Sequence, residues 1–191
     1  MVWAAMGVDS GRCGVYFIAG GTLAQKRITV KKFLRLRAVF SSPLILFRME
    51  KFFILIAEDD ADDRFLLQTV FTEKGYEDRI EFVENGVELM GYLQKIKESK
   101  KQTVGYPGFI LLDLNMPKKD GREVLKEIKQ HPIFKRIPII VFTTTKNDIE
   151  IKRCYDLGAN TYVVKPVTFD ALSKVVEEIR QYWFTTAAIP T

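Results

Sequence analysis

The sequence has few of the residues that build disulfide frameworks or metal clusters. Its 191 residues include two cysteines, Cys13 and Cys154, and a single histidine, His131. Two distant cysteines do not make a Cys/His metal cluster, and one histidine cannot build a histidine site. Disulfide frameworks belong mainly to secreted domains, which are rich in cysteine. We therefore expect a protein of the reducing cytoplasm, without structural disulfides.

Long apolar runs are missing as well. The longest ones near the N-terminus, Val15–Ala19 and Pro43–Phe47, are far shorter than the roughly 20 residues that a membrane-spanning helix needs. The overall composition, 47% hydrophobic and 28% charged, is that of an ordinary globular protein. The sequence therefore predicts no membrane span.

The positive charge is concentrated at the N-terminus. The whole chain has a formal net charge of +5, and residues 1–48 contain eight Lys or Arg residues against one acid, Asp9. Subtracting the +7 of this segment leaves −2 for residues 49–191. A nucleic-acid-binding domain is expected to be basic. The folded part of the chain therefore does not resemble one, and we expect no nucleic-acid partner.

Residues 1–48 show no sustained helical or alternating period, and two interpretations of them are open. An Arg-rich, acid-poor segment is typical of a targeting or membrane-surface leader. The alternative is that Met49 is the natural start, because Met49-Glu50-Lys51 directly precedes the first clear strand. We favour the second interpretation and expect residues 1–48 to be a disordered leader or upstream sequence. The domain is then residues 49–191.

From residue 52 onward, apolar strands alternate with amphipathic helices. Helical spacing of apolar residues occurs over 64–76, 87–96, 124–128, 149–157 and 172–183. Such alternation predicts βαβ units, and strands that are apolar throughout predict a parallel sheet covered on both faces. The expected fold is a doubly wound α/β domain of the flavodoxin-like (βα)5 type, with strand order 2-1-3-4-5. The five strands are predicted at Phe52–Ala57, Ile80–Val83, Phe109–Leu112, Pro138–Phe142 and Thr161–Val164.

Four of these strands end in chemically useful residues. Ligands of open parallel sheets bind at the carboxyl ends of the strands, so the endings are expected to form one site. They are Glu58-Asp59-Asp60, Asp113, Thr143-Thr144-Thr145 and Lys165-Pro166.

The residue types at this edge predict phosphoryl-transfer chemistry. Two carboxylates about 4 Å apart repel by roughly 4 kcal/mol at an effective dielectric of about 20, so Glu58, Asp59 and Asp113 together require a cation. An all-oxygen ligand set suits Mg²⁺. Lys165 and Thr143 can each donate a hydrogen bond to a phosphoryl oxygen. A carboxylate nucleophile, a divalent metal and these two donors predict phosphoryl transfer to Asp113.

Taken together, these segments resemble the receiver domain of two-component response regulators. The matching stretches are ILIAEDDADDR, ILLDLNMPKKDG, IPIIVFTTT and GANTYVVKP. The resemblance implies that Asp113 is the phosphoacceptor, with Glu58, Asp59 and the backbone carbonyl of Asn115 at the Mg²⁺ site. It also implies switch roles for Thr143 and Tyr162, and a cis peptide bond between Lys165 and Pro166. Thr144 departs mildly from the pattern, which usually has a small residue there.

The resemblance implies a single-domain regulator that acts through protein contacts. Its partner would be a histidine kinase or a phosphotransfer protein, and the sequence looks closest to regulators that partner phytochrome-type kinases. We also consider a homodimer, formed through the helix-four, strand-five and helix-five face or through the C-terminal aromatics Tyr182 and Trp183. We expect a switch rather than an enzyme, at most self-phosphorylating from small donors and dephosphorylating itself.

The main alternative is a Mg²⁺-dependent phosphatase with an aspartyl-phosphate intermediate. Such enzymes typically carry a second Asp two residues after the nucleophile, where this chain has Asn115. The chain also lacks a cap domain to enclose a substrate. A phosphorylation-independent scaffold is the third alternative, but it would predict a degraded site. The set of site residues is complete, which favours the receiver.

Overall fold

The computed structural model describes residues 3–9, 12–19, 22–29, 53–75, 80–99 and 105–189. The chain divides into two compact units, Met1–Glu50 and Lys51–Thr191. The division lies two residues after the boundary that we predicted between residues 48 and 49.

The first unit contains three antiparallel strands in the order β1-β2-β3. They are β1 (Trp3–Asp9), β2 (Arg12–Ala19) and β3 (Thr22–Thr29). These strands lie within the segment that we expected to be a disordered leader or upstream sequence. Whether this unit is a leader stays a prediction.

The second unit is built on a five-stranded parallel sheet, as predicted. Its strand order is β5-β4-β6-β7-β8, which is 2-1-3-4-5 when the strands of this unit are counted along the chain. The predicted fold class is therefore confirmed. The strands are β4 (Ile54–Ala57), β5 (Ile80–Val83), β6 (Phe109–Leu112), β7 (Ile139–Thr143) and β8 (Thr161–Val164).

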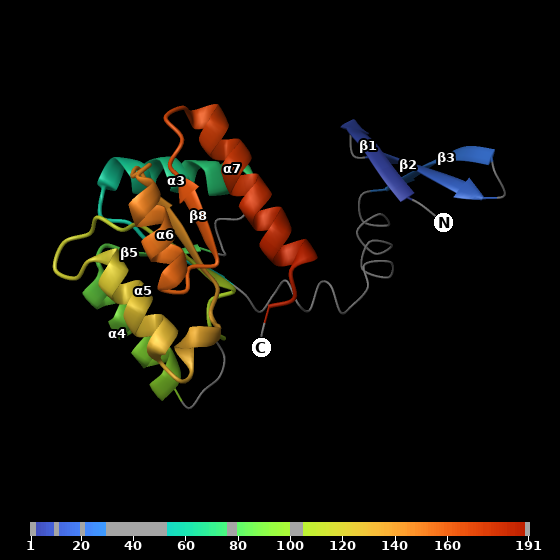
Figure 1. The fold of residues 1–191 in the computed structure, drawn as a ribbon. Helices are drawn as coiled ribbons and strands as arrows, with labels where there is room; N and C mark the ends of the chain where they lie inside the picture. Colours follow the sequence, from blue (N-terminus) through green and yellow to red (C-terminus); the bar gives the residue numbers. More distant parts are fainter. Residues whose placement is uncertain are drawn as a thin grey trace. The chain divides into compact units, whose positions relative to one another are not determined.

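Helices cover both faces of this sheet (Figure 1). Alternate residues of a strand point to opposite faces, so β4 contributes Leu55 to one core and Ile54 and Ile56 to the other. The core with Leu55 packs against α4 (Gly86–Glu98), α5 (Gly121–Gln130) and α6 (Asp148–Asp156). The core with Ile54 packs against α3 (Ala61–Glu73) and α7 (Phe169–Gln181). Burial on both faces explains why the strands are apolar throughout.

Each of the α-helices α3 to α7 is preceded by a polar residue whose side chain caps free backbone N–H groups of the first turn. Such caps stabilise a helix by about 1 kcal/mol. Asp60, for example, accepts hydrogen bonds from the backbone N–H groups of Asp62 and Asp63, at 2.9 and 3.0 Å. The other N-caps are Asn85, Asp120, Asn147 and Thr168.

The C-terminal aromatics that we considered as a dimer surface are divided between core and solvent. A π-helical turn, η3 (Tyr182–Thr186), follows α7. Trp183 packs against Phe109 of β6, with ring centroids 6.3 Å apart, and Phe184 packs there too. Tyr182 is exposed. Trp183 is therefore mainly a core residue, and Tyr182 remains available for a partner.

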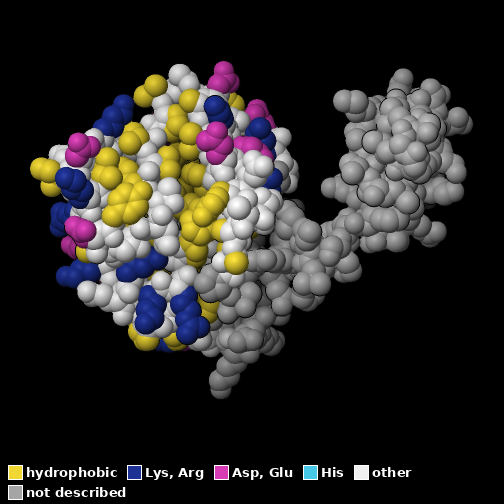
Figure 2. All heavy atoms as spheres, turned by 45° about the vertical axis from the view of Figure 1, so that its right-hand side comes forward, with side chains coloured by type: hydrophobic (Ala, Val, Ile, Leu, Met, Phe, Trp, Pro, Cys, Tyr) yellow, Lys and Arg dark blue, Asp and Glu magenta, His cyan; other side chains and the backbone are white. Residues whose placement is uncertain are grey.

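The surface of the second unit mixes apolar and charged side chains. On the face shown in Figure 2, apolar side chains gather at the centre and Lys and Arg side chains group along its lower edge. Among the described residues, no helix is long and apolar enough to cross a membrane.

Candidate functional site

The residues predicted for the site come from neighbouring strands and meet at one edge of the sheet. Backbone hydrogen bonds continue the ladder beyond the strand ends. The N–H of Glu58 donates to Val83 O at 3.0 Å, that of Asp113 to Ala57 O at 3.0 Å, and that of Lys165 to Thr143 O at 2.8 Å. The parallel sheet therefore fixes the position of the backbone from which each of these side chains extends at this edge.

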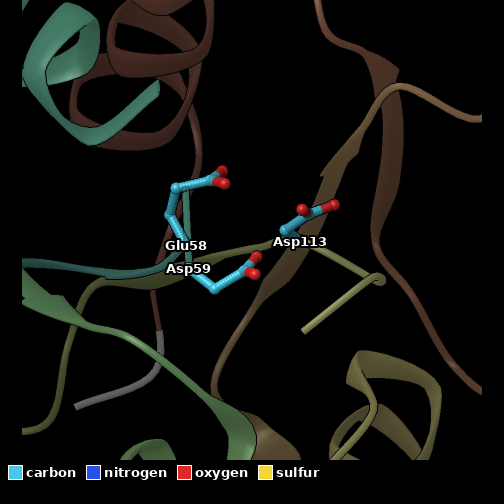
Figure 3. Close-up of side chains that lie close together, drawn as sticks. All are labelled: Glu58, Asp59 and Asp113. Atoms are coloured by element: carbon cyan, nitrogen blue, oxygen red, sulfur yellow. The ribbon is translucent and has the colours of Figure 1, made fainter. Parts of the chain in front are cut away.

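Three carboxylates form the acidic part of the site. One oxygen from each of Glu58, Asp59 and Asp113 lies within 4.8 Å of the other two. Figure 3 shows Glu58 and Asp59, which follow β4, facing Asp113 at the end of β6. Glu58 and Asp113 are buried, whereas Asp59 is reachable from solvent. Only oxygen ligands are gathered here, and one side is open to water. This donor set fits a hard divalent cation that keeps part of its hydration shell.

Lys165 supplies the balancing positive charge. Its Nζ lies 2.6 Å from Glu58 Oε2, 2.7 Å from Asp63 Oδ2 and 3.3 Å from Asp113 Oδ2. The lysine side chain is only 9% exposed. A buried ammonium is costly unless it is paired, so these contacts hold it in the site.

Burial and charge shift the pKa values of this pair. Burial raises the pKa of Glu58 to about 7, against the lowering effect of the Lys165 ammonium. Burial alone would lower the pKa of Lys165, but the hydrogen bonds to Asp63 and Glu58 and the charge of Asp113 outweigh it. The pKa of Lys165 is therefore raised. Lys165 stays protonated at neutral pH and can donate to an anion.

The two predicted switch residues lie on neighbouring strands. Thr143 ends β7 and is fully buried, and its Oγ1 has no hydrogen-bond partner among the described residues. Tyr162 lies in β8, half-buried against the core, and its hydroxyl donates to Thr145 O at 3.0 Å. Tyr162 thus ties β8 to the segment that follows Thr143.

The loop after Asp113 is held close to the phosphoacceptor candidate. The N–H of Leu114 donates to Asp113 Oδ1 at 2.7 Å, and that of Gly121 donates to Leu114 O at 2.9 Å. Asn115 is exposed in this loop. Whether its backbone carbonyl is a metal ligand stays a prediction. The Lys165–Pro166 bond is trans, in contrast to our expectation; trans is the form that X–Pro bonds favour intrinsically, by about 0.5–1 kcal/mol.

Two residues of α3 belong to the site although we assigned them no role in it. Arg64 donates to the backbone carbonyls of Glu58 and Asp59, at 2.9 and 2.7 Å, and pairs with Glu84 at 3.2 Å. Arg64 therefore fixes the turn that carries two of the three carboxylates. Asp63, an acid in the first turn of α3, contacts Lys165.

Comparison with known families identifies the domain. The model of the response regulator receiver domain matches residues 54–177. The chain belongs to this family. It is 39% identical over 137 residues to the response regulator Rcp1 of Synechocystis, covering 72% of this chain and 92% of Rcp1. It is 30% identical over 126 residues to the chemotaxis protein CheY1 of Helicobacter pylori, covering 66% of this chain and 94% of CheY1.

Solved response regulator structures share the fold. The phosphorylated cyanobacterial phytochrome response regulator RcpA aligns with a TM-score of 0.66 and 38% identity, over 74% of this chain and 99% of RcpA. The Mn²⁺-bound form of Rcp1 aligns with a TM-score of 0.62 and 38% identity, over 72% of this chain and 98% of Rcp1. The predicted receiver, its likeness to phytochrome regulators and its place in phosphoacceptor signalling are confirmed. Nothing in these likenesses favours the phosphatase alternative.

Proposed function

We propose that Asp113 accepts a phosphoryl group from a histidine kinase or a phosphotransfer protein. The observation that carries the proposal is the position of its buried carboxylate, between an acidic pair that fits a divalent cation and a protonated lysine. Receiver domains are generally phosphoacceptor switches that histidine kinases phosphorylate. We therefore propose a switch rather than an enzyme with an external substrate.

In the proposed step, one oxygen of Asp113 attacks the phosphorus of a phosphohistidine. The new P–O bond forms as the P–N bond breaks, and the leaving imidazole nitrogen takes a proton from water. Lys165 and Thr143 donate hydrogen bonds to the transferred group, and the N–H of Leu114 already fixes the other oxygen of Asp113. Such a site works by positioning and by neutralising charge.

We propose Mg²⁺ as the metal, held by Glu58, Asp59, Asp113 and the backbone carbonyl of Asn115. When bound, a divalent cation neutralises charge on the phosphoryl oxygens and on Asp113. Rcp1 has been solved with Mn²⁺, which supports a divalent cation at this edge. Asn115 is uncharged at the position where such a phosphatase typically carries an acid, so its side chain cannot act as the base that activates water.

The proposed output is a movement of the segment between β7 and β8. The phosphoryl group would draw the buried hydroxyl of Thr143 toward it, and the hydrogen bond from Tyr162 to Thr145 would rearrange. Moving a two-state equilibrium from 1:99 to 99:1 requires about 5.5 kcal/mol of differential stabilisation. Several charge-assisted hydrogen bonds to one phosphoryl group are strong enough to supply it.

The proposed partners are based on exposed apolar residues of α6 and on the relatives of this chain. We propose a phytochrome-type kinase as the donor, because a phytochrome response regulator is 38% identical to this chain. A partner or a second copy would contact α6, β8 and α7, where Ile149 and Tyr155 of α6 are exposed apolar residues. We place the protein in the cytoplasm, where receiver domains typically act.

The proposal is tested by incubating the full chain with Mg²⁺ and acetyl phosphate and measuring intact mass. We expect one phosphoryl adduct that is lost in base and prevented by removing the metal with EDTA. Asp113→Asn should abolish the adduct, whereas Asp156→Asn, which removes an exposed acid at the end of α6, should keep it. An undiminished adduct in Asp113→Asn would refute the assignment.

A further inference from the structure

The Lys165 ammonium is shared among three carboxylates, and one of them lies outside the metal cluster. Glu58 and Asp113 belong to the cluster, but Asp63 comes from the first turn of α3. Asp63 is also the nearer partner, at 2.7 Å against 3.3 Å for Asp113. The ammonium is therefore held more closely by Asp63 than by the proposed phosphoacceptor.

The local structure of α3 does not by itself require a carboxylate at this position. Asp60 already caps the helix by accepting from the N–H groups of Asp62 and Asp63. Asp62, the other first-turn acid, provides the same favourable interaction with the helix dipole. What distinguishes Asp63 is its contact with a lysine 102 residues further along the chain.

We propose that Asp63 is a positioning residue that restrains Lys165 in the unphosphorylated state, an inference that rests on the proposed function of Asp113. An ammonium has three N–H donors and no more, and three carboxylates occupy them here. A phosphoryl group on Asp113 must take one of these donors from a carboxylate. Asp63 therefore competes with the phosphoryl group for Lys165 and takes a share of the ammonium that Glu58 and Asp113 of the metal cluster would otherwise hold alone.

Two opposite effects follow when Asp63 loses its charge. Lys165 becomes freer to bind an anion on Asp113, so affinity for a phosphoryl mimic rises. The ammonium also moves toward the metal cluster, so affinity for Mg²⁺ falls. A partly exposed charge contact contributes up to about 1 kcal/mol, which corresponds to about a five-fold change in a dissociation constant.

The experiment compares Asp63→Asn with Asp62→Asn in the full chain by titration calorimetry. Both changes remove one acid from the same helical turn, but Asp62 has no contact with Lys165 among the interactions of the described residues. Relative to Asp62→Asn, we expect Asp63→Asn to bind beryllofluoride about five-fold more tightly at saturating Mg²⁺. We expect it to bind Mg²⁺ alone about five-fold less tightly. Asp63→Glu keeps the charge and should restore both constants.

The outcomes separate this inference from the proposed function. Wild-type protein that takes neither beryllofluoride nor a phosphoryl group would overturn the proposed function, and this inference with it. If the wild type binds but both asparagine variants behave alike, only the role of Asp63 is overturned. Weaker beryllofluoride binding in Asp63→Asn would also overturn it, because Asp63 would then orient the lysine rather than restrain it. Equal thermal midpoints of the two variants verify that both are folded.

Discussion

Gly121 offers the sharpest test of how the phosphoacceptor strand is held. This first residue of α5 lies so close to the strand that a Cβ would stand 2.1 Å from Asp113 O and 2.7 Å from Leu114 Cα. Both atoms belong to the backbone, so no side chain can turn away to relieve the overlap. Overpacking a tight site costs typically about 1–3 kcal/mol, and two backbone overlaps place Gly121→Ala at the upper end. We expect a loss of about 3 kcal/mol of unfolding free energy.

Gly91 is the matched control, because it lies inside α4 and a Cβ there would meet nothing within 4 Å. Alanine is a better helix former than glycine by about 0.5–1 kcal/mol, so Gly91→Ala should stabilise the domain. Urea unfolding of both variants, followed by far-UV circular dichroism, measures the two opposite changes. Gly121→Ala with wild-type stability would show that α5 does not approach Asp113 as closely as described.

Three further predictions concern stability. Thr143→Val removes a buried hydroxyl that has no partner among the described residues, and it should raise the unfolding free energy by about 1 kcal/mol. A lower unfolding free energy than the wild type, measured with urea, would contradict this. Trp183→Ala should lower the unfolding free energy by about 2 kcal/mol, because Trp183 packs against the core. Tyr182→Ala should change it little, because Tyr182 is exposed. Burial lowers the pKa of Lys129 to about 8, so its charging penalises the folded state below pH 8. Between pH 8 and 10.5 the folded state loses this proton while the unfolded state still binds it, so the penalty disappears. In this range the unfolding free energy of the wild type, measured relative to that of Lys129→Met, should rise by about 1–2 kcal/mol after allowance for solvent screening.

The fold could be predicted from the sequence because the signals are local and repeated. Each strand is a short run of apolar β-formers, and each helix carries apolar residues at helical spacing. The helix boundaries were predicted less accurately than the elements themselves. For example, α5 begins at Gly121, three residues before Val124, the first apolar position that we used. Its start is set by the cap at Asp120. Because this cap is polar, a search for apolar spacing does not detect it.

The site was predictable as far as the sheet determines it. Parallel strands bring their carboxyl ends together, so Glu58, Asp113 and Lys165 were expected to meet, and they do. Asp63 and Arg64 were missed because their roles depend on side-chain direction. Adjacent residues of a helix point about 100° apart, so one first-turn acid can face solvent while its neighbour faces the site. The sequence alone does not distinguish Asp62 from Asp63 in this respect.

Thr143 and Lys165 also show how such a site can be bistable. A buried hydroxyl without a partner costs about 1–3 kcal/mol, and an ammonium shared by three carboxylates leaves those carboxylates close enough to repel one another. The cost of the unpaired hydroxyl falls on the unphosphorylated arrangement and would be offset by a hydrogen bond to an anion on Asp113. The repulsion among the carboxylates would be offset by a divalent cation. A phosphoryl group then needs to supply only part of the free energy that separates the two states. Variants that remove these costs, such as Thr143→Val, should therefore stabilise the unphosphorylated protein and weaken its response to phosphorylation together.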